Sequence, residues 1–289
     1  MSPEPISAVA GRVPAAAAAK AGFRLHPSYI APLFITLVLL IAGFTVQILE
    51  SPWKTAAAIG ASIVTELILG RIFFGKWPNV ASAYVSGISV GILLRSPHLW
   101  PYVYCAVLSI SSKYVLRWHG RHLWNPSNFG IAASLVTLHN FGISTLTIQF
   151  GNSIGAMLVI WTLGSIIVGR LKRFHQCATY VVSFFAFAAV RALIQGTSYW
   201  AQVAPITGPM YQLFTFFMIT DPKTTVRGKR GQMLVVFLVA LLEAVLRLNN
   251  NTHAPYYALF FVGPIANALE IWSDRRKATR LAASPAPAG

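Results

Sequence analysis

Long apolar runs alternate with short polar stretches along the chain, and ten such runs can be counted. The runs cover residues 29–49, 55–74, 80–94, 100–116, 126–138, 153–169, 177–194, 206–220, 231–246 and 255–272. A helix needs about 20 residues to cross the hydrocarbon core of a bilayer. The pattern therefore predicts an all-α, polytopic membrane protein with ten transmembrane helices.

The third, fifth and eighth runs are short and have Gly, Pro or Asn nearby. We expect them to form half-helices or broken helices. An interrupted backbone is stable at membrane depth only when it is buried in protein or lines a cavity.

The positions of the basic residues indicate an orientation. With the N-terminus inside, 18 of the 23 Lys and Arg residues fall in inner loops or at the chain ends, and four fall in outer loops. This asymmetry is what the positive-inside rule predicts. We therefore expect a cell-membrane protein with both termini in the cytoplasm.

Landmarks in the first half recur in the second. Pro97 and Pro222 each follow a short run, Lys113 and Glu243 each lie four residues before an Arg, and Pro126 and Pro255 each open a run. Because five crossings is an odd number, two such halves have opposite orientations. The sequence predicts two inverted five-helix repeats with a functional site near the midplane between them.

The expected domain organisation follows from these runs. Residues 1–26 form a disordered basic leader, 27–272 a single membrane domain, and 273–289 a basic cytoplasmic tail. Within the membrane domain, repeat one spans 27–140 and repeat two spans 150–272.

Composition agrees with this prediction, since 55% of the residues are apolar and 10% are charged. A soluble domain has about 25% charged residues, so that class and disorder are excluded. The net charge of +16 would suit nucleic acid in a soluble protein, but here it sits between apolar runs, so no nucleic-acid partner is expected. The main partner is the lipid bilayer.

Three ionisable residues lie inside apolar runs, where such groups usually mark function. They are Glu66, Lys113 and Glu243. If the repeats superpose, Lys113 and Glu243 are equivalent and could approach each other beside a charge or transport pathway. The alternative is a structural ion pair between packed helices, and Glu66 could simply reach the interface with Arg71.

The sharpest local feature is the string Thr220-Asp221-Pro222. Pro222 disfavours helix before itself, so the chain should leave the eighth run with Asp221 at the break. Asp221 could cap the next turn, bind a cation or hold a cofactor hydroxyl. Asn125-Pro126 is a similar string, and it could be no more than a helix start.

Other signals are weaker. Gly87 and Gly91 form a GxxxG pattern that favours close helix packing. His119 and His122 fall in a basic loop, where solvated histidines are expected rather than haem ligands. The two cysteines, Cys105 and Cys177, indicate neither a disulfide framework nor a metal site, and no phosphate-binding glycine loop or catalytic triad spacing is present.

These landmarks together resemble the NqrB/RnfD family, the membrane subunits of the sodium-pumping NADH:quinone reductase and of the Rnf electron-transport complex. The resemblance rests on residues 86–97 (SGISVGILLRSP), on Asn125-Pro126 and on residues 216–222 (FFMITDP), and it spans most of 27–272. The family fold has ten helices in two inverted five-helix repeats and is similar to that of urea transporters. The chain is most similar to compact stand-alone relatives encoded with natural-product pathways.

The resemblance implies a flavin cofactor. Family members that bind FMN covalently attach it to the last Thr of a Ser/Thr-Gly-Ala-Thr motif, which the corresponding stretch 139–152 lacks although it contains Ser144, Thr145 and Thr147. We therefore expect noncovalent FMN or riboflavin rather than covalent FMN. Asn125, Pro126, Thr220, Asp221 and Pro222 are the expected cofactor-binding residues.

Two functions follow as expectations. The first is a membrane electron-transfer subunit that relays electrons for a redox partner protein or other complex subunits, coupled or not to cation transport. The second is a transporter or channel for a small solute on the same scaffold, with a route lined by the Phe-rich seventh and eighth runs. A visible flavin absorbance band discriminates between them.

Overall fold

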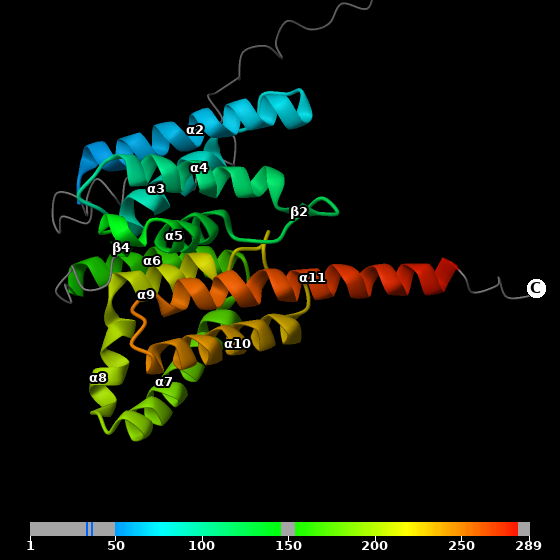
Figure 1. The fold of residues 1–289 in the computed structure, drawn as a ribbon. Helices are drawn as coiled ribbons and strands as arrows, with labels where there is room; N and C mark the ends of the chain where they lie inside the picture. Colours follow the sequence, from blue (N-terminus) through cyan, green and yellow to red (C-terminus); the bar gives the residue numbers. More distant parts are fainter. Residues whose placement is uncertain (1–32, 34–35, 37–49, 146–153, 283–289) are drawn as a thin grey trace, which may run out of the picture.

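The computed structural model describes residues 33, 36, 50–145 and 154–282, and the chain is mostly helical (Figure 1). The described helices match nine of the ten predicted apolar runs, whereas the first run lies outside the described residues except for Leu33 and Thr36. The α-helices are α2 (Pro52–Phe74), α3 (Ala81–Leu93), α4 (Trp100–Val115), α5 (Pro126–Thr137), α6 (Ile154–Arg170), α7 (Phe174–Gln195), α8 (Tyr199–Val203), α9 (Pro209–Leu213), α10 (Lys229–Leu248) and α11 (Ala254–Ala282). The prediction of a mostly helical chain is confirmed, and the described residues add four strands of two residues each.

Three of the described helices, α2, α7 and α10, are long and apolar enough to cross a membrane. The shorter helix α3 and residues 160–170 of α6 are also apolar. Many outward-facing side chains on these helices are large and apolar, such as Val182 and Leu193 on α7, which are 68% and 84% exposed.

The predicted helix breaks are present. Helix α3 ends where Leu94 turns extended, and the two-residue strand β1 (Leu94–Arg95) pairs antiparallel with β4 (Ser144–Thr145). The eighth run is divided into a 3₁₀ turn, η4 (Ala204–Thr207), the short helix α9 and a π-helical turn, η5 (Phe214–Met218). Neither the strand pair nor α8 was predicted from the pattern.

The glycines of the GxxxG pattern lie where α3 meets α2. A Cβ atom on Gly87 would be 2.5 Å from the Cα of Ile59, and one on Gly91 would be 2.6 Å from the side chain of Thr55. The expectation of close packing is confirmed, since only glycine lets the two helices approach this far.

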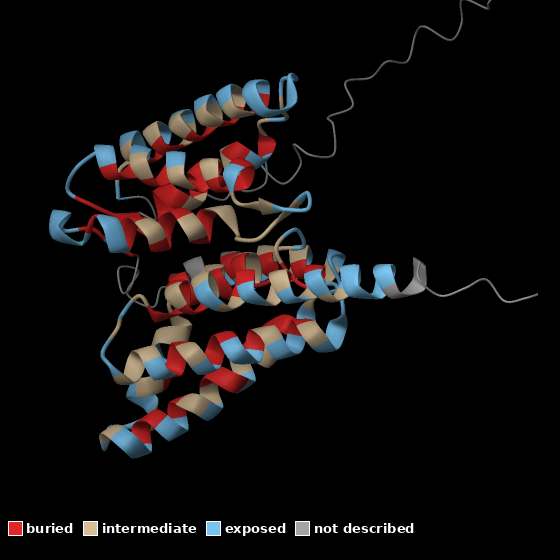
Figure 2. Cartoon of the chain, turned by 45° about the vertical axis from the view of Figure 1, so that its right-hand side comes forward, coloured by how far each residue is buried: buried red, intermediate tan, exposed pale blue. Residues whose placement is uncertain are grey.

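The helices form two groups that meet along α5 and α11. In the first group α2 packs on α3 and α4, and α4 packs on α5; in the second, α7 packs on α10, and α10 packs on α11. Asn128 of α5 donates its side-chain amide to the carbonyl of Tyr256 in α11 at 3.2 Å, and the indole of Trp124 donates to the carbonyl of Phe260 at 2.9 Å. Buried residues line the inner faces of both groups (Figure 2).

The chain passes between two opposite ends of the molecule. Figure 1 places the hairpin of β2 (Arg117–Trp118) and β3 (Arg121–His122) on the same side as the C-terminal part of α11, and places α8 and β4 on the other. We call these the hairpin end and the α8 end. Helix α11 continues to Ala282, ten residues beyond the predicted end of the last apolar run at 272.

Candidate functional site

A cavity of about 710 Å³ lies toward the hairpin end, between the first helix group and residues 217–224. This volume is in the range of about 300–1,000 Å³ that small-molecule sites occupy. Five of the residues singled out from the sequence line it: Glu66, Lys113, Asn125, Pro126 and Asp221. We call this space the polar cavity.

Two of these five form a buried ion pair at one wall of the polar cavity. The ammonium of Lys113, on α4, donates to Glu66 Oε2 on α2 and to Ser82 Oγ on α3, the latter at 3.3 Å. The hydroxyl of Tyr114 donates to the other carboxylate oxygen of Glu66 at 3.0 Å. Glu66 is thus bound to Lys113, whereas Arg71 donates to the carbonyl of Gly75.

The predicted approach of Lys113 to Glu243 is wrong. Glu243 lies in the second helix group and is fully buried on α10, where it accepts hydrogen bonds of 2.6 Å from the hydroxyls of Tyr180 and Tyr211. The guanidinium of Arg247 donates to the Tyr211 hydroxyl and lies 4.0 Å from the Glu243 carboxylate. Each group therefore neutralises its own buried carboxylate, and Glu243 does not line the polar cavity.

The two predicted proline strings meet at the opposite wall. The side-chain amide of Asn125 donates to Asp221 Oδ2 at 3.0 Å, although 96 positions separate the two residues. Asp221 also accepts from the backbone N–H of Lys223 at 3.1 Å and from the hydroxyl of Thr224 at 2.9 Å. Asp221 therefore caps the turn after η5, as one of the predicted alternatives required.

Asn125 is also the N-cap residue of α5. Its Oδ1 accepts from the backbone N–H of Asn128 at 3.0 Å, and Pro126 occupies the first helical position. Asn125-Pro126 is therefore a helix start, as predicted, and the same amide joins that start to Asp221.

The remaining predicted site residues do not line the polar cavity. Thr220 is buried and donates its hydroxyl to the carbonyl of Phe216 at 2.5 Å, and Pro222 is exposed. Thr145 is buried in β4 and hydrogen-bonded to His253 Nδ1 at 2.8 Å, whereas Thr147 lies outside the described residues. Of the Phe residues in the seventh and eighth runs, Phe217 lines the cavity.

The β2–β3 hairpin brings two further residues to the polar cavity, Arg117 and His122. Arg117 donates to the carbonyl of Gly120 at 2.7 Å, and its guanidinium lies 5.3 Å from the ring centre of Phe74. Burial lowers the pKa of His122, and so do the positive charges of Arg117, Lys113 and Lys223, against the opposing effect of Asp221. His122 is half-buried in the cavity wall, so it is more enclosed than the solvated loop histidine that was expected, whereas His119 is exposed.

Two polar atoms at this wall lack a protein partner in the part of the chain that is described, namely Arg117 Nε and His122 Nδ1. A buried polar atom without a partner is destabilising unless water or a ligand satisfies it. Gly120 is the sequence feature that could have indicated that Arg117 and His122 lie close together. It has a φ of 79°, a conformation that glycine adopts readily, and it lies in the turn between β2 and β3.

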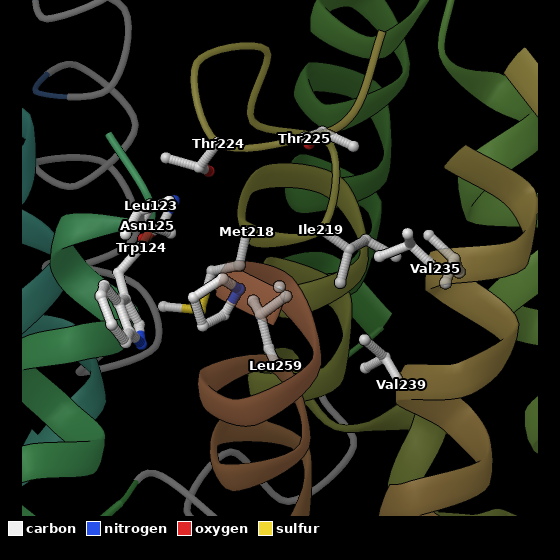
Figure 3. A pocket seen from close by; sticks show the side chains of 13 residues that line it. Leu123, Trp124, Asn125, Met218, Ile219, Thr224, Thr225, Val235, Val239 and Leu259 are labelled. Atoms are coloured by element: carbon white, nitrogen blue, oxygen red, sulfur yellow. The ribbon is translucent and has the colours of Figure 1, made fainter. Parts of the chain in front are cut away.

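A small enclosed space of about 20 Å³ adjoins the polar cavity where the two helix groups meet. In Figure 3, Asn125 and Thr224 lie on one side of it, Val235 and Val239 on the other, and Met218 between them. The volume fits one water molecule, for which about 10–15 Å³ suffices. Asn125 therefore borders two spaces, the polar cavity and this small space, whose other lining residues are mostly apolar.

The described residues contain no group of three or more His, Cys, Asp or Glu side chains that could hold a metal ion. Both cysteines are buried and free. Neither a scan against protein-family models nor a search of curated proteins finds a match to this chain.

Proposed function

We propose that this chain is an integral membrane protein that crosses the bilayer ten times as two inverted five-helix repeats. Three apolar helices of spanning length and the exposed apolar side chains of α7 support a lipid environment. Equivalent packing in the two helix groups supports the repeat, since α2–α4 and α4–α5 in the first correspond to α7–α10 and α10–α11 in the second.

The hairpin end is then the cytoplasmic end, and both termini are cytoplasmic. Two clusters of basic residues support this orientation, because the β2–β3 hairpin carries Arg117 and Arg121 and the C-terminal part of α11 carries Arg275, Arg276 and Lys277. Figure 1 shows both on the same side of the molecule. Cytoplasmic loops of membrane proteins are enriched in such residues.

We further propose that the protein is an electron-transfer subunit that binds FMN or riboflavin noncovalently in the polar cavity. The observation that carries this proposal is the composition of the cavity wall. Phe74, Tyr114 and Phe217 supply aromatic rings, and polar groups lie between them. A planar ring system of flavin size fits both the volume and this mixture of surfaces.

The unpartnered Arg117 Nε and His122 Nδ1 add to this fit, because a ligand with several hydrogen-bonding edges could satisfy them. When bound, a flavin would supply the electron chemistry, and the protein would supply orientation and electrostatics. Arg117 would hold positive charge beside the ligand, while Lys113 and Glu66 neutralise each other and Asp221 is hydrogen-bonded within the protein. Electrons would be exchanged with a redox partner protein or with other subunits of a complex.

The test is optical. The full chain, purified in mild detergent, is expected to show a flavin absorbance band and to release FMN or riboflavin on acid precipitation. Phe217→Leu, in the cavity wall, is expected to lower flavin occupancy severalfold. Phe216→Leu is the matched control, because the neighbouring Phe216 ring packs toward Gly164 and does not line the cavity. Colourless protein that takes up no added flavin contradicts the cofactor.

A second function, transport of a small solute, is favoured by the shape of the polar cavity. It reaches the surface at Phe74, Asn79 and Lys223, which are exposed, and has the buried Glu66–Lys113 pair in its wall. Such a chamber is accessible from one side, as alternating access requires. Colourless protein that accelerates the swelling of proteoliposomes in urea would support this function over electron transfer.

A further inference from the structure

A groove of about 660 Å³ runs along the outside of the second helix group, between α10 and α11. Its walls are aliphatic except for Glu270 at one end. Leu234, Leu238 and Leu241 form the α10 wall, and Val262, Ile265 and Leu269 form the α11 wall. We call it the α10–α11 groove.

The groove has the length of a lipid tail in one leaflet. From Gly231 to Val245 on α10 it covers fourteen helical steps, or roughly 21 Å at about 1.5 Å per residue. Half of the hydrocarbon core of a bilayer is about 15 Å thick. A single acyl chain of a phospholipid therefore fits along it.

The end of the groove toward the hairpin end carries basic side chains. Arg230 lies one turn before Leu234 and two turns before Leu238, and is exposed on the same face of α10. On α11, Arg276 and Lys277 lie seven residues beyond Leu269 and Glu270, which places them two turns further along the groove face. All three side chains are exposed.

The acidic residues near this end are already paired. Glu270 binds the Arg121 guanidinium at 2.7 Å and accepts from the backbone N–H of Arg227, and Asp274 lies 3.5 Å from the Arg227 guanidinium. Arg230 and Lys277 form no ion pair with a described carboxylate, and Arg276 lies against the ring of Trp272, 3.6 Å from its centre. The end of the groove is therefore positively charged.

Trp272 indicates where this end of the groove lies relative to the lipid headgroups. Tryptophan is enriched at the level of lipid headgroups, and Trp272 is 46% exposed on α11 between Leu269 and Arg276. The aliphatic groove thus ends near headgroup level, where Arg230, Arg276 and Lys277 begin.

We propose that the α10–α11 groove is a binding site for an anionic phospholipid of the cytoplasmic leaflet. One acyl chain lies in the groove, and the phosphate is held by Arg230, Arg276 and Lys277. The inference rests on the membrane orientation proposed above and is independent of flavin binding. An aliphatic channel that ends in several cations is complementary to this ligand, whereas a zwitterionic lipid gains less from the cations.

The experiment compares two lipids with identical acyl chains, phosphatidylglycerol and phosphatidylcholine, titrated onto the purified full chain and followed by native mass spectrometry. The wild-type chain is expected to prefer phosphatidylglycerol. The triple variant Arg230→Gln, Arg276→Gln, Lys277→Gln is expected to lose on the order of 100-fold in affinity for it, since each basic residue near an anionic headgroup contributes about 1 kcal/mol. The matched control removes three exposed basic residues elsewhere, with Arg71→Gln, Lys76→Gln and Arg170→Gln, and keeps the preference.

A second variant tests the groove itself. Ala266→Phe fills the α10–α11 groove and is expected to weaken binding of phosphatidylglycerol, whereas Ala278→Phe, beyond the groove, is expected to leave it unchanged. Equal binding of the two lipids, an unchanged affinity in the triple variant, or a lipid-independent dimer that covers the groove would each overturn the proposal. Because the flavin band is read on the same sample, a coloured preparation without lipid preference contradicts this site alone.

Discussion

At the residue scale, the two helix groups stabilise a buried carboxylate in different ways. Glu66 is held by the ammonium of Lys113 and by one phenol hydroxyl, that of Tyr114, whereas Glu243 is held by two phenol hydroxyls, one of which accepts from Arg247. Taking a charge out of water costs several kcal/mol unless partners compensate it. The Glu66–Lys113 pair lines the polar cavity, whereas Glu243 lies in the packed core. A change of charge at Glu66 would therefore also change the electrostatics of the cavity.

We predict that breaking the Glu66–Lys113 pair is more destabilising than removing it. Lys113→Met leaves the Glu66 carboxylate buried without its cation, which should cost about 3–5 kcal/mol in free energy of unfolding. Adding Glu66→Gln to that variant should recover most of this loss, because the uncompensated charge is gone. Thermal unfolding in detergent measures both, and strictly additive losses would show that the two side chains do not interact.

His122 should make stability depend on pH. Because burial and neighbouring cations lower its pKa below 6.5, the folded protein binds this proton less tightly than the unfolded chain does. The free energy of unfolding should therefore decrease as the pH falls below about 6.5, by at most about 1.4 kcal/mol for each pH unit, until the folded-state pKa is passed. His122→Gln should flatten this part of the pH profile.

The control for His122 lies in the same hairpin. His119 is exposed, so His119→Gln should leave the pH profile as it is in the wild type. Burial also lowers the pKa of His253, in the same direction. Part of the slope should therefore persist in His122→Gln, and a slope that is identical in all three proteins would contradict the assignment to His122.

At the element scale, the close contact of α2 with α3 depends on the missing side chains of Gly87 and Gly91. We predict that Gly87→Ala destabilises the protein by about 1–3 kcal/mol, because the added Cβ would meet the backbone of Ile59 and the helices would have to move apart. Gly60→Ala, on α2, is the matched control. Nothing lies within 4 Å of its added Cβ, so it should stabilise the helix by about 0.5–1 kcal/mol. Thermal unfolding of both variants in the same detergent measures the difference. Equal melting temperatures would contradict the close contact of Gly87 with the backbone of Ile59.

The sequence predicted where helices begin and break better than it predicted which side chains pair across them. Proline fixes local geometry, so the start of α5 at Pro126 and the break before Pro222 could be predicted from local sequence alone. The choice of Asp221 as the partner of Asn125, and of Glu66 as the partner of Lys113, depends on how helices far apart in sequence pack. The strands β1 and β4 have two residues each, which is too short for any periodic pattern.

The end of α11 was missed for a different reason. The apolar pattern stops at Trp272, so the following charged residues were interpreted as a tail. Alanine, arginine, lysine and leucine have high helix propensity, and residues 273–282 continue the helix. Apolarity predicts where a helix can contact lipid, whereas propensity decides where it ends.

At the scale of the whole molecule, the polar cavity lies between the first helix group and residues 217–224, whereas the α10–α11 groove lies on the outside of the second helix group. The polar cavity is lined by charges of both signs, and the groove is aliphatic up to its basic end. The α5–α11 contact joins the two groups through Trp124, Asn128 and Asn267, whose side chains donate to carbonyls on the opposite segment. Together with the Asn125–Asp221 hydrogen bond in the wall of the polar cavity, these hydrogen bonds link segments that are far apart in the sequence at the place where the two groups meet.

Orientation in the membrane is the prediction on which the lipid site in the α10–α11 groove depends. A reporter fused after Gly289 should be cytoplasmic, because the basic residues of the α11 extension cannot easily be carried across the bilayer. Single cysteines at Asn79 and Asn249, both exposed and at opposite ends of the molecule, should react with an impermeant thiol reagent from opposite sides. The native cysteines are buried, so they add little background. Labelling of both positions from the same side would contradict an odd number of crossings between them, and with it the inverted repeat.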